Sequence, residues 1–81
     1  MQRTRAIDYA ISLTKNQRPS ELAHLLGYKL QRINWWKIND IPNGEIYKVA
    51  KVLTLNNSKG IIVEPRVLHT MKFEAKIHKG E

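Results

Sequence analysis

Apolar residues recur in the first half of the chain at the spacing of short amphipathic helices. In residues 4–15, one helical face collects Ala6, Ile7, Ala10, Ile11 and Thr14, with Leu13 at its margin. A second helix is predicted to begin at Pro19, because the N–H that proline lacks would be unpaired at a first helical position anyway. It is predicted to end at Gly27, which adopts a left-handed conformation at little cost.

Two further helices are predicted before the polar turn segment at residues 56–60. The third runs from about Leu30 to Lys37 and stops at Asn39-Asp40, because the proline of Ile41-Pro42 forces extended backbone on the residue before it. The fourth begins at Asn43-Gly44. Its apolar residues fall at helical spacing on one face, namely Ile46, Val49, Ala50 and Leu53.

Residues 61–81 fit two structures. The β-branched run Ile61-Ile62-Val63 fits a short strand, whereas a helical face would collect Val67, Leu68, Met71 and Ala75. Strict alternation fits Met71, Phe73, Ala75 and Ile77 equally well, so periodicity does not choose between helix and strand. The chain is predicted to be mainly α, a compact bundle of four to five short helices whose C-terminal segment is a helix or a short strand. We assign residues 1–58 to the bundle and 59–81 to a C-terminal extension of a single domain.

The stretch from Pro19 to Trp36 has the spacing of a helix-turn-helix. Two short helices that cross steeply need a small residue where they approach, which Ala23 supplies, and a turn residue that tolerates positive φ, which Gly27 supplies. Ile33 and Trp36 share one face of the second helix and would dock on the first. The predicted core of this unit is Leu22, Ala23, Leu26, Gly27, Ile33 and Trp36. The alternative interpretation is an ordinary bend between two core helices.

This stretch also resembles a known family. The residues that carry the resemblance are Leu22-Ala23, Leu26-Gly27, Ile33, Trp36-Lys37 and Ile41-Pro42, and it extends over roughly residues 6–55. They resemble the Cro and repressor-type helix-turn-helix proteins of phages and related prophage or antitoxin regulators. The resemblance implies a lambda-repressor-like bundle that binds an operator as a homodimer and represses a nearby promoter. The chain departs from the family pattern at Lys29, where Ser or Thr is common, and at Leu30, where a polar base-reading residue is common.

Charge favours the same class of partner. The 81 residues include 14 Lys and Arg against 7 Asp and Glu, a formal net charge of +7. A small domain this basic suits a polyanion such as double-stranded DNA. Cysteine is absent, which excludes disulfides, thiolate metal sites and cysteine nucleophiles. No apolar run approaches the ~20 residues of a membrane span, and we expect a cytoplasmic, nucleoid-associated protein.

The third helix is the predicted DNA-reading element. With Ile33 and Trp36 facing inward, the opposite side of the helix carries the polar amides of Gln31 and Asn34. Side-chain amides match the adenine edge in the major groove, and a leucine can contact a thymine methyl group. The predicted base contacts are Gln31, Asn34, Leu30 and Trp35, and the predicted phosphate contacts are Lys29, Arg32, Arg18 and Lys37. For Trp35, a DNA contact, packing on the fourth helix and a subunit contact remain equal alternatives.

The C-terminal segment is predicted to form a homodimer contact through Val67, Leu68, Met71 and Phe73. No enzyme, cofactor or metal site is expected, because the three histidines lack ligand spacing and the carboxylates are scattered. The leading function is therefore a Cro-like repressor on a palindromic operator. The alternatives are an activator, an antitoxin-type regulator whose C-terminal segment binds a partner protein, and an RNA-binding module. The last has neither aromatic platforms nor a GXXG loop to support it.

Overall fold

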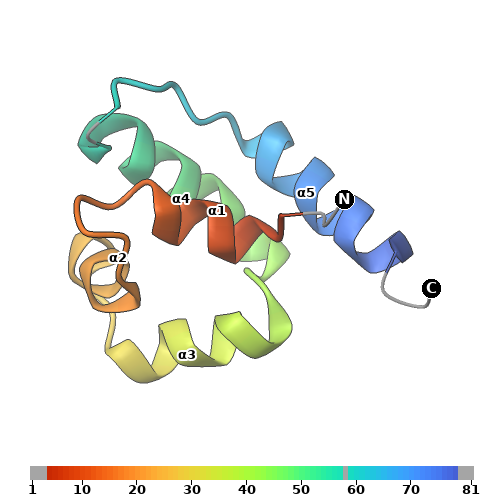
Figure 1. Ribbon diagram of the computed structural model, residues 1–81, viewed down its shortest axis with the longest axis horizontal. Coiled ribbons are helices and arrows are strands. Elements are labelled where there is room, and N and C mark those ends of the chain that lie inside the picture. The colour runs from red at the N-terminus through yellow and green to blue at the C-terminus, as the bar shows by residue number, and fades with distance from the viewer. Residues whose placement is uncertain (1–3, 58, 79–81) are drawn as a thin grey trace.

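Five helices follow one another with short connections (Figure 1). The structure, a computed structural model, describes residues 4–57 and 59–78, and the helices within them are α1 (Ala6–Ser12), α2 (Pro19–Leu26), α3 (Leu30–Asn39), α4 (Asn43–Asn56) and α5 (Pro65–His78). The prediction of a compact, mainly helical bundle is confirmed. The C-terminal segment is a helix, and the described residues contain no strand. The side chain of Ile77 lies outside the described part.

The run Ile61-Ile62-Val63, which also fits a strand by sequence, is held as an extended loop against the end of α4. The Thr54 hydroxyl donates to the Val63 carbonyl (3.0 Å) and accepts from the Val63 N–H (2.9 Å). The Asn57 side chain accepts from the Ile61 N–H (2.9 Å) and donates to the Ile61 carbonyl. These side chains satisfy the backbone groups that a neighbouring strand would otherwise pair. β-Branched composition therefore reflects a docked loop here rather than a sheet.

The first helix is shorter than residues 4–15. After Ser12 the chain tightens, with Leu13 N–H donating to Ala10 O (3.2 Å) and Thr14 N–H donating to Ile11 O (3.1 Å). The Thr14 hydroxyl is buried, donates to Ile11 O (2.7 Å) and accepts from the Arg18 N–H (3.1 Å). Thr14 thus ends α1 and fixes the entry to α2, because its hydroxyl bonds backbone on both sides of the turn.

A single core collects apolar side chains from all five helices and from the loop before α5. Its buried members include Ile7 of α1, Leu22 of α2, Trp36 of α3, Leu53 of α4 and Leu68 of α5. Leu68 is 0% exposed. The prediction that Leu68 contacts a second copy is therefore wrong, because this side chain fills the protein's own core and presents no surface to a partner.

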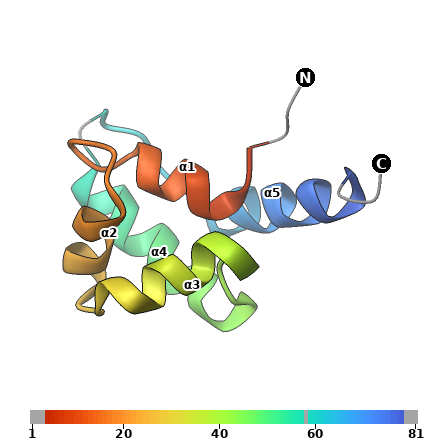
Figure 2. The ribbon, with the colours of Figure 1, turned by 60° about the horizontal axis from the view of Figure 1, so that its bottom comes forward.

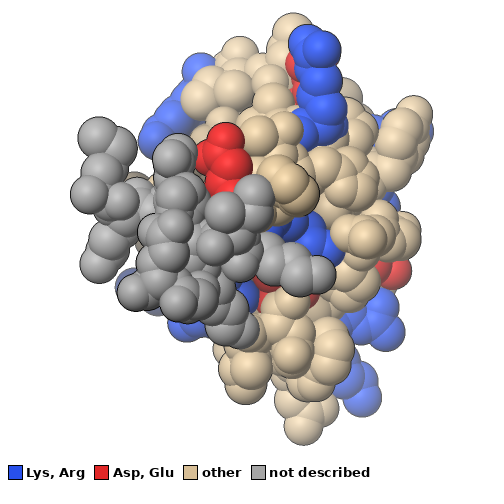
Figure 3. Space-filling view, turned by 90° about the vertical axis from the view of Figure 1, so that its right-hand side faces the viewer, with Lys and Arg blue, Asp and Glu red and all other residues tan. Residues whose placement is uncertain are grey.

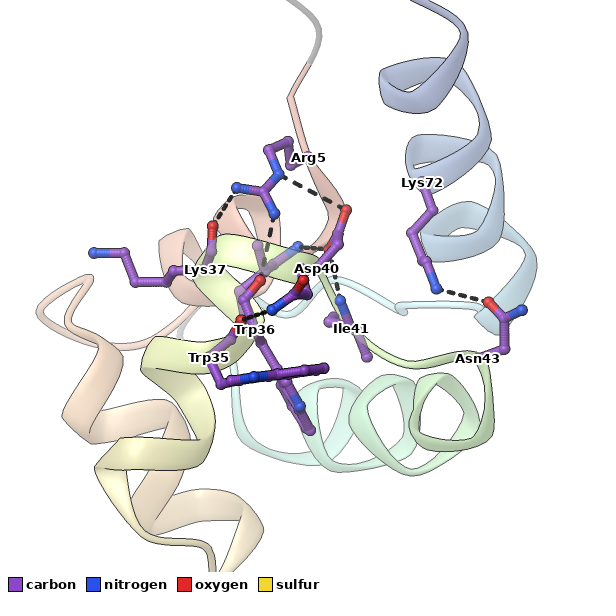
Figure 4. Close-up of polar contacts among 10 residues, drawn as sticks. Arg5, Trp35, Trp36, Lys37, Asp40, Ile41, Asn43 and Lys72 are labelled. Carbon is purple, nitrogen blue, oxygen red and sulfur yellow. Dashed lines mark hydrogen bonds and ion pairs between the residues drawn. The ribbon is translucent and has the colours of Figure 1, made fainter. Parts of the chain in front are cut away.

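The start of α1 and the end of α3 are joined by a clasp made of Arg5 and Asp40 (Figure 4). The Asp40 carboxylate accepts through Oδ1 from the backbone N–H groups of Ile7 (2.9 Å) and Ile41 (2.8 Å). The Arg5 guanidinium donates to the backbone carbonyls of Trp36 (3.4 Å) and Lys37, and its Nε lies 4.0 Å from Asp40 Oδ2. Asp40 thus caps the N-terminus of α1, while Arg5 caps the C-terminus of α3.

We expect Asp40→Ala to lower the free energy of unfolding by about 1–3 kcal/mol, because it leaves the N–H groups of Ile7 and Ile41 without their acceptor. Asp40→Asn is the matched control. It retains an oxygen acceptor on a side chain of the same size and bears the same backbone conformation, with φ +66°, so its loss should be clearly smaller. Denaturant unfolding followed by circular dichroism measures both. Equal losses for the two variants would show that the carboxylate charge beside Arg5, and not the capping acceptor, provides the stabilisation.

Candidate nucleic-acid interface

Helices α2 and α3 are joined by a turn whose geometry follows from Gly27. This glycine has φ +74°, its N–H donates to His24 O (3.2 Å), and the next N–H, from Tyr28, donates to Ala23 O (2.9 Å). This pair of bonds is a Schellman motif, which needs a left-handed residue directly after the helix. The predicted end of α2 at Gly27 is confirmed, and α3 begins after residues 27–29 in a new direction (Figure 2).

The side chains predicted to pack within this unit are buried, and Ala23 is among them. Trp36 is 2% exposed and Ile33 is 0% exposed, so they anchor α3 from its inner side. The remaining eight of the ten residues of α3 are exposed. A helix held by two inward side chains presents nearly its whole outer face to a partner.

Tyr28, which the sequence analysis did not single out, ties the turn to α4. Its ring meets the Trp36 ring edge-on at 5.9 Å between centroids. Its hydroxyl donates to Glu45 Oε1 (2.6 Å) and accepts from Lys48 Nζ (2.9 Å). Tyr28 is the second residue after α2, directly behind the left-handed Gly27. Its hydrogen-bond partners Glu45 and Lys48 lie 17 and 20 residues away from it in the sequence. Local pattern carries no signal for them.

Three of the four predicted base-contacting residues share the outer face of α3. At about 100° per residue, Gln31, Asn34, Trp35 and Ile38 fall within an arc of roughly 100°. Leu30 is 45% exposed, Trp35 57% and Ile38 75%. Among the described residues, no hydrogen-bond partner engages the side-chain amides of Gln31 and Asn34. The structure thus brings Gln31, Asn34 and Trp35 to one surface, which Ile38 extends, whereas Leu30 lies at the margin of this surface, about 40° around the helix from Asn34.

Three of the four predicted phosphate contacts lie on α3 or directly before it, and the fourth lies directly before α2. Lys29 precedes α3 and makes no capping bond with its side chain. The guanidinium carbon of Arg32 lies 4.1 Å from the centre of the Tyr28 ring, and Lys48 Nζ lies at the same distance from it. Lys48 therefore joins Arg32 at one flank of α3, a cation that the sequence analysis missed. Lys37 lies in the last turn of α3, and Arg18 precedes α2.

A shallow hollow of about 550 Å³ lies between α3 and the start of α4. Its walls are formed by Gln31, Arg32, Trp35, Trp36, Pro42, Gly44 and Glu45. Trp35 borders the first turn of α4 yet keeps more than half of its surface exposed. Its side chain therefore remains accessible to a ligand that approaches the outer face of α3.

The charge of the described residues can be followed on the face of the molecule that Figure 3 presents. Figure 3 shows basic side chains on that face scattered among uncharged ones. Within residues 4–57 and 59–78, no group of three or more His, Cys, Asp or Glu residues could hold a metal ion. No helix in the described part of the chain is long and apolar enough to cross a membrane.

Comparisons of the chain with protein-family models, curated proteins and solved structures found no match.

The two adjacent tryptophans should differ sharply in solvent access. In Trp36→Phe the remaining Trp35 should be quenched efficiently by acrylamide and emit at longer wavelength, because most of its ring is in water. In Trp35→Phe the remaining Trp36 should be protected and emit at shorter wavelength. Equal quenching of the two folded variants would show that the register of α3 is wrong.

Proposed function

We propose that this chain is a sequence-specific, double-stranded DNA-binding transcriptional regulator, a Cro-like repressor that binds a palindromic operator as a homodimer. The observation that carries the proposal is the outer face of α3, which presents two unengaged side-chain amides on a helix anchored by Ile33 and Trp36. An α-helix fits the major groove of B-DNA, and side-chain amides match base edges there. A rigid helix with free amides is therefore suited to direct readout.

Charge supports the same partner. The net charge of +7 provides attraction to the phosphate backbone. Lys29 and the Arg32–Lys48 pair lie beside the reading face, where they would contact phosphates and set the register of α3 in the groove. Arg32 and Lys48 are held near the Tyr28 ring, so less side-chain freedom is lost when they bind. A regulator of this kind acts in the cytoplasm, on nucleoid DNA.

The homodimer is proposed to form through the outer side of α5. Leu68 anchors the helix on the core, which leaves Phe73 65% exposed and Val67 and Met71 partly exposed. A large exposed aromatic side chain on an ordered helix suits a protein contact. The packing of α5 on the core supports a second copy as the partner, whereas an antitoxin-type segment would order only on its target.

Gln31→Ala and Asn34→Ala should each relax base preference. Each is expected to cost about 1–3 kcal/mol of binding at the preferred base pair and much less on random duplexes.

Binding of the unmodified protein should also fall steeply with salt, as expected if ~4–6 phosphates are neutralised by each half of the dimer. Fluorescence anisotropy with labelled duplexes at several salt concentrations measures both effects.

Asn56→Ala is the matched control, because its amide lies at the end of α4 and donates only to Val52 O (2.8 Å). It should leave affinity and sequence preference unchanged. Uniform weakening by Gln31→Ala and Asn34→Ala on all duplexes would reassign these residues to positioning. Equal affinity of the unmodified protein for every duplex at every salt concentration would refute sequence-specific binding.

Phe73→Ser should convert the dimer to a monomer without unfolding it, because the side chain is largely outside the core. Leu55→Ser is the control, since Leu55 is also exposed but lies on α4. Sedimentation equilibrium reports the mass of each variant, and circular dichroism reports its fold. If the unmodified protein is monomeric at high micromolar concentration, the homodimer proposal is wrong. Phe73 would then be expected to contact a protein of another sequence, as in the antitoxin-type alternative.

A further inference from the structure

We propose that α3 reads A·T base pairs through the major groove, so that the positions specified in each operator half-site are A·T. This inference rests on the proposed function and names the class of DNA site that the same helix recognises. It follows from the full set of side chains on the outer face of α3, both those that are present and those that are missing.

The two amides select adenine. Gln31 and Asn34 each carry a donor beside an acceptor, which matches the N6 donor and N7 acceptor of adenine. Neither side-chain amide has a hydrogen-bond partner within the described chain. They are three residues apart, which corresponds to about 4.5 Å along the helix axis and compares with the 3.4 Å rise of one base pair. The pair is thus spaced to contact neighbouring base pairs.

The apolar side chains between and beside the amides select thymine. Trp35 and Ile38 are large, exposed and on the outer side of α3, and the exposed Leu30 lies at the margin of this side. The thymine C5-methyl group is the apolar group that base edges present in the major groove. Burying these side chains against methyl groups removes apolar surface from water, which a G·C pair does not offer. This accounts for apolar residues on a face that is otherwise polar.

The side chains that read G·C pairs are missing from this face. Guanine is read most often by Arg or Lys, and the cytosine N4 donor is read by Asp or Glu. Helix α3 contains no acidic residue. Its two cations, Arg32 and Lys37, lie about 100–120° around the helix from Ile38, and Arg32 lies over the Tyr28 ring. These cations are therefore placed toward the phosphates on either side of the reading face.

The experiment begins with selection of sites from random duplexes by the full-length protein, followed by replacement of single bases in the selected site. Deoxyuridine replaces thymine and removes only the methyl group, and 7-deazaadenine removes only the N7 acceptor. We expect affinity to fall roughly threefold to fivefold for each contacted methyl and roughly 5- to 150-fold at each contacted adenine. Diaminopurine in place of adenine adds a minor-groove amino group and should have little effect.

Variants assign each effect to a side chain. Ile38→Ala should lose sensitivity to deoxyuridine at the thymine that Ile38 contacts, and Asn34→Ala should lose sensitivity to 7-deazaadenine at its own base pair. Ile62→Ala is the control, because Ile62 is as exposed as Ile38 but lies in the loop before α5. It should retain both sensitivities.

Three outcomes would overturn the inference while leaving sequence-specific binding intact. They are a selected site specified by G·C pairs, insensitivity to both major-groove analogues, and loss of binding with diaminopurine alone, which would indicate minor-groove readout. Failure to enrich any sequence would instead refute the proposed function, and the inference with it. The two kinds of failure are therefore distinguishable in one series of measurements.

Discussion

The exposed helix α3 depends on the clasp between Arg5 and Asp40. Only Ile33 and Trp36 of α3 are buried, so apolar packing holds one narrow side of the helix. At its C-terminal end, Asp40 accepts hydrogen bonds from the start of α1, and Arg5 returns hydrogen bonds to the last carbonyls of α3. Each helix end therefore supplies the partner that the other lacks. The clasp fixes the C-terminal end of α3 against the start of α1.

Asp40 adopts a backbone conformation that few residues tolerate, with φ +66° and ψ 177°. Such a conformation costs of order 1–3 kcal/mol and persists only where surrounding contacts determine it. Here the determining contacts are the two N–H groups that the carboxylate accepts and the nearby guanidinium. The strain is thus tied to a specific geometry, in which the chain turns from α3 into Ile41 and Pro42 while the carboxylate stays buried.

The opposite end of α3 is held in a different way. The Schellman turn at Gly27 directs the chain, and Tyr28 connects the turn to Trp36 and to Glu45 and Lys48 of α4. With both ends held, the middle of α3 needs few buried residues, and its outer face is free to carry exposed apolar side chains. Trp35 and Ile38 are neighbours on one helical face and together leave apolar surface in water. On the proposed reading face they are the groups that thymine methyls would cover.

Much of this architecture was predictable from local pattern. Helical periodicity located α2, α3 and α4, and Gly27 marked the turn, because these signals depend on neighbours within a few residues. The same spacing placed Trp36 inside and Trp35 outside. The grouping of Gln31 and Asn34 on one outward face followed in the same way, since the period of the helix alone decides it.

Tertiary structure decided the features that join residues distant in the sequence. The Asp40 acceptor and the Ile7 N–H are 33 residues apart, and no periodicity relates them. Periodicity also did not determine the secondary structure of the C-terminal segment, because short apolar runs fit a helix and a strand equally well. Ile61-Ile62-Val63 forms a docked loop because its backbone groups are hydrogen-bonded by the hydroxyl of Thr54 and the amide of Asn57. Leu68 is buried because α5 packs on α4 and α1, and this packing is set by the assembled bundle rather than by the spacing of residues within α5.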